Sequence, residues 1–292
     1  MKIQFVDKLN EDTLVEDKQV KFGGEVNPKY GWCVIYAGGP ASGKSSSERY
    51  NIPIVGKKMD ADEFKSVEFK NKETGKFDPG FVKKFMGGKY YDMILNHPNI
   101  AGDKSKMSIN NPEYVSAAHE ILEPFIDKVK DNMKSLGKYN DPSRLPNIIF
   151  DQTSKNIDKL MRQIVEVKKV GYKVAIVWVL TDIEKNLNAF KKRNDKGRKM
   201  NPALFMDIHP KVFNAMISVF DNPELLSMLD EFWVVINSYK PQNTSKQQLN
   251  QIRSENVYHI DLVPDGLKKE KPVWDLIKKS LNDLEFYKGL GN

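Results

Sequence analysis

The stretch Gly38-Gly39-Pro40-Ala41-Ser42-Gly43-Lys44-Ser45 directly follows the apolar run Trp32-Cys33-Val34-Ile35-Tyr36-Ala37. A continuous apolar run of this length is typical of a strand that is buried on both faces of a parallel sheet. The eight residues after it satisfy the pattern Gly-x-x-x-x-Gly-Lys-Ser/Thr at every fixed position. Roughly one chain of this length in a hundred would do so by chance. We therefore predict a phosphate-binding loop between a strand and a helix that begins near Lys44.

The residue types in this loop suit a nucleoside triphosphate. Glycines let the backbone curl until its N–H groups face inward onto phosphate oxygens, and the positive end of the following helix points to the same place. A lysine can bridge the β- and γ-phosphates, and a serine hydroxyl can ligate Mg²⁺. We expect ATP or GTP, with Mg²⁺, to bind through Gly38, Gly39, Pro40, Ala41, Ser42, Gly43, Lys44, Ser45 and Ser46, with Ser45 as a metal ligand.

Working outward from the loop, apolar runs alternate with amphipathic segments. Further strands are expected at 54–59, 147–150, 172–180 and 232–236, with a sixth element at 257–260. Helices are expected from about 112 to 136, from 157 to a stop at Gly171, and from 273 to 284. Thr181-Asp182-Ile183-Glu184 has the form of a capping box that starts another helix. This alternation predicts an α/β chain with the three-layer P-loop NTPase fold and a parallel sheet.

Composition changes along the chain suggest its organisation. Residues 1–30 lack a sustained period and are expected to be an N-terminal extension. Residues 31–240 are expected to form the P-loop domain, with an insertion at 66–110 that is rich in Gly, Lys, Asn and Pro and a lid at 190–210. Residues 241–292 are expected to form a C-terminal segment that ends in a helix.

Charge and cysteine content narrow the class of protein. The 292-residue chain has a net charge of +7 and a pI of about 9.1, and residues 181–211 hold eight Lys or Arg against four acids. An excess of this kind invites an anionic partner, although a lysine-rich solvated surface explains it equally well. No apolar run reaches the length of a membrane span, no signal peptide is evident, and Cys33 is the single cysteine. We expect no membrane association and a cytoplasmic protein.

Two acids follow the second expected strand and favour phosphoryl transfer over other P-loop activities. A GTPase would carry Asn-Lys-x-Asp after a strand, and a mechanical ATPase would end an apolar run in Asp-Glu; the chain has neither. Asp60 and Asp62 instead stand where the second strand ends, at the edge where such folds bind ligands. Either carboxylate could accept a proton from a hydroxyl and align it for attack, or both could simply begin a helix.

Asp151 and two arginines complete the candidate machinery. Asp151 follows the third expected strand and could hold Mg²⁺, contact the acceptor or cap a helix. Arg193 and Arg198 lie in the basic segment, where lid arginines could neutralise the charge that spreads in the transition state, or could belong to a solvated basic loop. The four histidines show no metal-ligand spacing and are taken as structural or substrate-contacting.

From 32 to 237 the chain resembles the zeta-toxin family of P-loop kinases and, more distantly, the polynucleotide 5′-kinases. The family's Asp-x-Asp-x-Phe-Lys element is matched by Asp60, Asp62, Phe64 and Lys65, which implies Asp62 as the general base. Arg193 falls at the family's first lid arginine, and His209-Pro210-Lys211 resembles the Thr-Pro-Lys that follows the lid. Asp207 stands where the family has its second lid arginine, so Arg198 is the substitute candidate.

The resemblance also bears on the acceptor. The family's Glu-Gly-Thr-x-Arg-like element reads Asp151-Gln152-Thr153-Ser154-Lys155, which departs from it at both charged positions. Phages encode similar kinases that phosphorylate 5-hydroxymethyluracil in their own DNA, and a phage-encoded chain would act in the host cytoplasm. The expected substrate-binding residues are Asp60, Lys65, Asp151, Thr153 and Lys155.

Three functions are compatible with these features. The preferred hypothesis is a Mg²⁺·ATP-dependent kinase that phosphorylates a hydroxyl on a nucleic acid. The second is a zeta-toxin-type kinase acting on UDP-N-acetylglucosamine, a nucleotide sugar. The third is a P-loop protein that binds a nucleotide without catalysis, which the presence of Asp62 and Arg193 disfavours.

Overall fold

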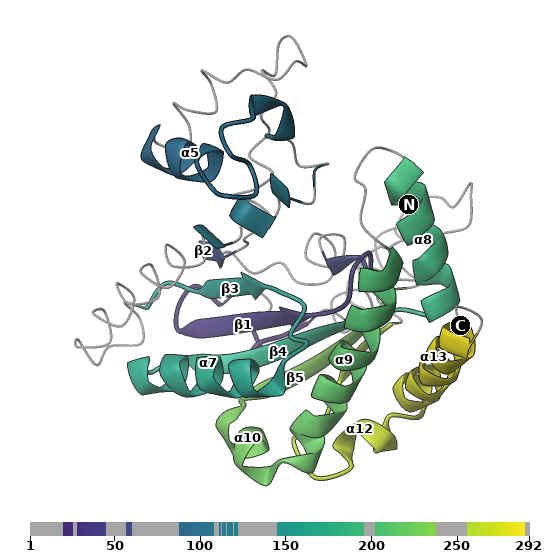
Figure 1. Ribbon diagram of the computed structural model, residues 1–292. Coiled ribbons are helices and arrows are strands. Elements are labelled where there is room, and N and C mark those ends of the chain that lie inside the picture. Colours follow the sequence, from purple (N-terminus) through teal and green to yellow (C-terminus); the bar gives the residue numbers. More distant parts are fainter. Residues whose placement is uncertain are drawn as a thin grey trace, which may run out of the picture. The chain divides into compact units, whose positions relative to one another are not determined.

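A computed structural model of the protein describes its fold for a defined part of the chain (Figure 1). The described residues are 20–25, 28–44, 57–59, 88–107, 111, 113–114, 116–118, 120–121, 145–195, 202–237 and 256–289. The chain forms two compact units. The larger unit comprises 1–58, 136–190 and 202–292, and the smaller comprises 59–135 and 191–201. The smaller unit therefore includes the expected insertion at 66–110 and continues beyond it on both sides.

The larger unit is built on a sheet whose described strands follow the order β2-β3-β1-β4-β5-β6. These strands are β1 (Trp32–Ala37), β2 (Lys57–Met59), β3 (Ile148–Asp151), β4 (Lys173–Leu180), β5 (Glu231–Ile236) and β6 (Val257–His259). β1 pairs in parallel with β3 and β4, and β4 pairs in parallel with β5. The α/β class and the parallel core of the sheet are confirmed. β6 runs antiparallel to β5, which corrects the expectation of a wholly parallel sheet.

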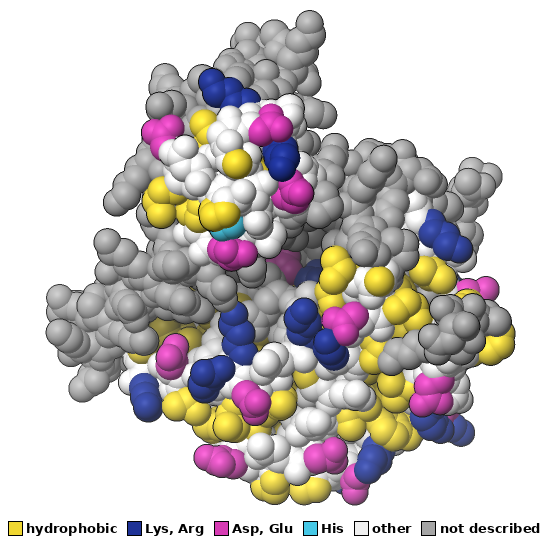
Figure 2. Space-filling view, viewed as in Figure 1, with side chains coloured by type: hydrophobic (Ala, Val, Ile, Leu, Met, Phe, Trp, Pro, Cys, Tyr) yellow, Lys and Arg dark blue, Asp and Glu magenta, His cyan; other side chains and the backbone are white. Residues whose placement is uncertain are grey.

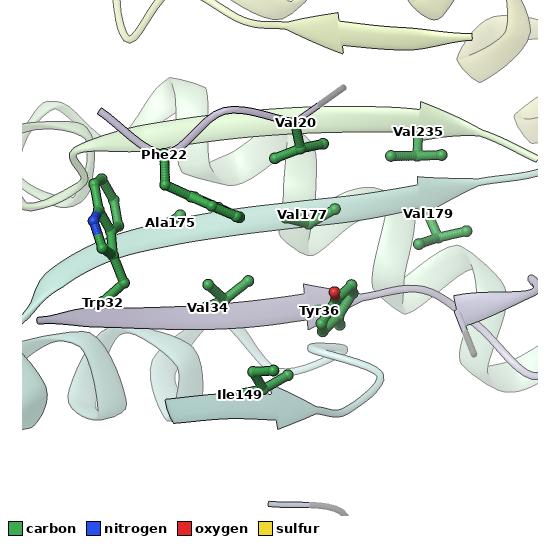
Figure 3. Close-up of a cluster of buried hydrophobic side chains, with 10 residues drawn as sticks. All are labelled: Val20, Phe22, Trp32, Val34, Tyr36, Ile149, Ala175, Val177, Val179 and Val235. Atoms are coloured by element: carbon green, nitrogen blue, oxygen red, sulfur yellow. The ribbon is translucent and has the colours of Figure 1, made fainter. Parts of the chain in front are cut away.

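One face of the sheet carries a continuous apolar cluster. Alternate side chains of neighbouring strands point to this face because side-chain direction reverses at every residue of a strand. The cluster, drawn in Figure 3, consists of Val20, Phe22, Trp32, Val34, Tyr36, Ile149, Ala175, Val177, Val179 and Val235. Phe22 packs on Trp32 with 5.4 Å between ring centroids. Residues 20–25, expected as part of an extension, therefore cover the core of the sheet.

Helices cover the opposite face. These are α7 (Ile157–Val170), α9 (Pro202–Asp221) and α10 (Pro223–Met228), which contact one another. Trp178 of β4 meets Phe213 of α9 edge-on at 5.4 Å, and Phe232 of β5 meets Phe220 of the same helix at 4.9 Å. Aromatic pairs in this geometry add about 1 kcal/mol each to the burial of their area.

The ends of α7 follow directly from local sequence. The Asn156 side chain accepts a hydrogen bond from the Lys159 N–H at 2.9 Å, which satisfies one of the free donors of the first turn. Gly171 ends the helix with φ of 101°, a left-handed conformation that glycine adopts without steric cost. The predicted helix and its glycine stop are confirmed.

The C-terminal residues belong to the same unit. After β6 come α12 (Gly266–Lys269) and α13 (Lys271–Gly289), which both contact α9. The predicted helix at 273–284 is confirmed and is longer at both ends. No helix among the described residues is long and apolar enough to span a membrane.

The smaller unit has its own core. Its described elements are α5 (Gly88–Leu95), the short 3₁₀ helix η1 (Lys104–Lys106) and helical residues between 113 and 121. They bury a cluster formed by Ile94, Ile100, Met107, Tyr114, Ala117 and Ala118. Lys106 pairs with Glu113 at 2.8 Å, and His97 lies 3.0 Å from Glu120.

The segment expected as a lid is largely helical where it is described. α8 (Ile183–Asp195) ends inside it and α9 begins at Pro202, with 196–201 outside the described residues. Phe190 of α8 packs on Phe205 of α9 at 5.1 Å. This contact places α8 and α9 side by side.

Candidate nucleotide-binding site

The predicted phosphate loop leaves the carboxyl end of β1, the strand that lies between β3 and β4. The Gly38 N–H donates to the Thr153 carbonyl at 3.3 Å, which joins the start of the loop to the segment after β3. Lys44 donates from Nζ to the Gly38 carbonyl at 2.8 Å and so closes the loop from its other end. Ligands of open α/β sheets bind at this edge, where the strand order reverses.

Two residues of the loop adopt left-handed backbone conformations. Ala41 has φ of 60° and Gly43 has φ of 90°. For a residue with a Cβ this conformation costs about 1–2 kcal/mol. Alternation of right- and left-handed residues turns successive N–H groups toward one concave side, which makes an anion-binding nest. The strain at Ala41 is therefore consistent with a loop shaped for phosphate.

Side chains at the ends of β4 and β5 hold the carbonyl of Ser42. Thr181 donates from Oγ1 at 2.9 Å, and Asn237 donates from Nδ2 at 2.7 Å. Thr181 directly follows β4, and Asn237 directly follows β5. Two neighbouring strands thus fix one peptide group of the loop.

Side chains from two helices hold the preceding carbonyls. His209 of α9 lies with Nε2 3.0 Å from the Pro40 carbonyl oxygen. Asn186 of α8 lies beside it; with its amide nitrogen facing the loop, it donates to the Ala41 carbonyl at 2.8 Å and to the Pro40 carbonyl at 3.2 Å, and its oxygen lies 3.2 Å from His209 Nε2. This orientation is assigned from the hydrogen-bond network, because the alternative places the amide oxygen against the two carbonyls.

The consequence of these contacts is an oriented backbone. In a trans peptide the C=O and the N–H point in opposite directions. Binding the carbonyls of Pro40 and Ser42 to the protein therefore directs the N–H groups of Ala41 and Gly43 away from those contacts. The Ser42 N–H itself bonds the Gly39 carbonyl at 3.2 Å.

The predicted capping box at Thr181 is wrong. Asp182, one residue later, accepts the Lys185 N–H at 3.2 Å and so caps α8, while Thr181 is buried against the phosphate loop. The other Asp182 oxygen accepts from Lys279 of α13 at 2.5 Å. Partial burial alone would raise the pKa of Asp182, but the hydrogen bonds from Lys279 and Lys185 hold that pKa below its usual value.

His209 is 2% exposed and is uncharged near neutral pH. Burial lowers the pKa of His209 from 6.5 to about 4; the hydrogen bond with Pro40 opposes this shift, and the positive charge of Lys44 adds to it. A neutral ring beside the loop leaves the local positive charge to Lys44.

Protonation of His209 should destabilise the fold in acid. Below pH 6.5 the unfolded histidine binds a proton that the folded one refuses until about pH 4, so the free energy of unfolding falls as the pH drops through this window. The loss should reach about 3 kcal/mol for a shift of this size. Denaturant unfolding between pH 7.5 and 4.5 measures it, and His209→Gln should show a shallower fall. Parallel pH profiles for the two proteins would contradict the assignment.

The segment after β3 places the predicted acceptor element beside the loop. Asp151 is the last residue of β3 and lies in register with Tyr36 of β1. Thr153 contributes its carbonyl to Gly38, and Ser154 is buried with φ of 54° and its hydroxyl 3.4 Å from the Tyr36 carbonyl. Lys155 is exposed. Asp151 is thus near the start of the loop, as a Mg²⁺ or acceptor ligand would need to be.

Other predicted residues lie outside what the structure describes. Their positions are those of Ser45, Ser46, Asp60, Asp62, Lys65 and Arg198. Arg193 belongs to the last turn of α8, but its side chain is not described. Within the described ranges no group of three or more His, Cys, Asp or Glu could hold a metal ion. The roles predicted for these residues stay predictions.

The described surface charges give limited support to the expectation that the basic segment 181–211 attracts an anionic partner. Lys185 and Lys191 of α8 are exposed, whereas Lys211 pairs with Asp207 one helical turn away at 2.6 Å. On the face shown in Figure 2, basic and acidic side chains of the larger unit are interspersed among apolar ones.

Sequence reasoning missed the four side chains that hold the loop: Thr181, Asn186, His209 and Asn237. Thr181 and Asn237 follow predicted strands at their carboxyl ends, and that position was a usable signal. Asn186 and His209 lie inside helices; nothing in the local sequence marks Asn186, and His209 was noted only as part of His209-Pro210-Lys211 without a contact to the loop.

Comparison with known proteins was made on sequence and on structure. No protein-family model and no curated protein matches the chain. Among solved structures, a chain from the PezAT chromosomal toxin–antitoxin system of Streptococcus pneumoniae aligns over 96% of this chain and 97% of its own, with 14% identity and a TM-score of 0.42. The AvrRxo1-ORF1:-ORF2 complex with ATP aligns over 79% of this chain and 63% of its own, with 15% identity and a TM-score of 0.40. The native AvrRxo1-ORF1:-ORF2 complex aligns over 96% of this chain and 84% of its own, with 15% identity and a TM-score of 0.39.

Proposed function

We propose that this protein binds a nucleoside triphosphate, ATP or GTP, at the loop 38–45 and transfers its γ-phosphoryl group to a hydroxyl. The observation that carries the proposal is the backbone of the loop, in which three successive carbonyls are bound to the protein at the carboxyl edge of a parallel sheet. The N–H groups of Ala41 and Gly43 are thereby directed away from these contacts, while the Ser42 N–H bonds the Gly39 carbonyl. Such an arrangement stabilises a chain of phosphates without any need for the loop to refold.

Lys44 and Asp151 supply the charges that phosphoryl transfer requires. Lys44 ends in an ammonium group 2.8 Å from the start of the loop, where it can meet the β- and γ-phosphates. Mg²⁺ prefers carboxylate and hydroxyl oxygens, which Asp151 and, by its place in the motif, Ser45 would provide. The metal would neutralise charge on the phosphates.

The acceptor side of the reaction is proposed from the sequence. Asp62 is the proposed base that takes the proton of the attacking hydroxyl, with Asp60 as the alternative, and Arg193 and Arg198 are proposed to stabilise the transferred phosphoryl group. The excess of Lys and Arg in 181–211 makes a nucleic acid the first candidate acceptor and a nucleotide sugar the second. The pairing of Lys211 with Asp207 occupies one cation and one acid of this segment and leaves the excess unchanged.

Transfer of label from γ-labelled ATP tests the proposal. The acceptors are DNA containing 5-hydroxymethyluracil, DNA with a 5′-hydroxyl, and UDP-N-acetylglucosamine. We expect label on one of them, and about a hundredfold less with Asp62→Asn, which should still bind ATP because a base acts on the acceptor. Binding of ATP with no label on any acceptor would instead indicate a non-catalytic nucleotide-binding protein.

A further inference from the structure

The side chain of His209 lies directly against the phosphate loop. Its Nε2 is 3.0 Å from the Pro40 carbonyl oxygen and 3.2 Å from the Asn186 amide. Its ring packs on Phe205, one turn earlier on α9, with 4.3 Å between centroids. The ring therefore has polar contacts on its loop side and an aromatic contact on its helix side.

Gly39 faces this ring. A Cβ at position 39 would lie 2.5 Å from His209 Nε2 and closer still to Cε1 and Nδ1. Distances under 3.0 Å do not occur for real Cβ atoms, so an alanine here would require the ring or the loop to move. Position 39 is one of the variable positions of the loop pattern, and Gly39 does not have a left-handed φ. The requirement for glycine at this position therefore comes from His209.

The ring has little freedom to move aside. It is 2% exposed, and Phe205, Asn186 and Pro40 surround it. Protein interiors are close-packed, so a displaced side chain shifts its neighbours. A side chain added at position 39 would thus be accommodated mainly by the loop.

We propose that His209 is a positioning residue for the phosphate loop, which holds the Pro40 peptide in its triphosphate-binding orientation by interlocking with Gly39. The inference rests on the proposed function, because it assigns His209 a role in binding the triphosphate of the same site. An unsupported loop would have to be ordered at the moment of binding, and that ordering lowers affinity. A supported loop binds without this loss.

A double-mutant cycle tests the interlock. The proteins are wild type, Gly39→Ala, His209→Ala and the double variant, and the measurement is the Kd for ATP and for inorganic tripolyphosphate well below each melting temperature. We expect the Kd to rise at least about tenfold in Gly39→Ala and severalfold in His209→Ala. The double variant should bind more tightly than Gly39→Ala alone, because the methyl group then occupies the space of the ring. Both ligands should respond alike, since the effect lies in phosphate binding.

Two further variants separate positioning from stability. His209→Gln keeps an amide N–H that can reach the Pro40 carbonyl and should bind ATP more tightly than His209→Ala. Val212→Ala removes buried methyl groups from the same helix and should lower the melting temperature while leaving the Kd unchanged.

The outcomes distinguish the inference from the proposed function. If wild type binds ATP and the two single effects simply add in the double variant, the interlock is wrong and the proposed function stands. If Val212→Ala weakens binding as much as His209→Ala, His209 acts only through stability. Wild type that binds neither ATP nor tripolyphosphate would overturn the proposed function and the inference together.

Discussion

Lys44→Ala is expected to lower phosphoryl transfer by about a thousandfold while the chain stays folded. The Lys44 ammonium is 2.8 Å from the Gly38 carbonyl and partly buried in the loop, where it can neutralise the charge that develops between the β- and γ-phosphates. Groups that stabilise charge in the transition state contribute about a hundredfold to a thousandfold each, and Lys44 also contributes to binding the ground state. Single-turnover transfer from labelled ATP measures the loss.

Lys169→Ala is the matched control for that experiment. Lys169 is an exposed lysine in the last turn of α7, outside the loop and outside the basic segment 181–211. It should retain wild-type turnover. Comparable losses in the two variants would show that general positive charge matters and not the position of Lys44, and full activity of folded Lys44→Ala would remove the assignment of the loop as the site.

Gly43→Ala should abolish nucleotide binding at millimolar ATP. Gly43 has φ of 90°, and a Cβ there would lie 2.9 Å from Cγ of Asn237 and closer still to its amide nitrogen. That nitrogen donates to the Ser42 carbonyl, so the methyl group would displace the contact that orients this peptide. Backbone strain of about 1–2 kcal/mol adds to the steric effect. Equilibrium binding of ATP, followed by calorimetry, measures the result.

Gly24→Ala separates strain from contact. Gly24 has φ of 87° but has no atom within 4 Å of an added Cβ, and it lies in a turn of the N-terminal segment. The Gly24→Ala protein should lose about as much stability from backbone strain as Gly43→Ala does, and it should keep its affinity for ATP. Equal affinity in Gly43→Ala and wild type would contradict the contact between Gly43 and Asn237 as a determinant of the loop.

The positions of four strands along the chain were predictable because each of these strands is an apolar run. β1, β3, β4 and β5 all appear within one or two residues of their predicted positions. α7 was equally predictable from its spacing and from Gly171. These signals are local: a strand buried on both faces must be apolar throughout, and a helix with one buried face must repeat at 3.6 residues.

α9 was not predicted. Its first half falls in the segment expected as a lid, and the helix runs from Pro202 to Asp221 with Pro210 inside it. An interior proline costs about 3 kcal/mol. The buried contacts of Phe213 and Phe220 with the sheet offset that cost, and they exist only when the strands are in place.

By itself the sequence determined the strands around the loop 38–45 and the α/β class, and it predicted phosphate binding at that loop, since these depend on neighbouring residues. Only the tertiary structure decided what holds the loop: Thr181, Asn186, His209 and Asn237 converge on it from two strand ends and two helices. The two side chains that bond the Ser42 carbonyl are far from it in sequence: Thr181 follows Ser42 by 139 residues and Asn237 by 195. No local pattern encodes such partners, because they meet only when parallel strands bring their carboxyl ends to one edge and buried helices pack beside it.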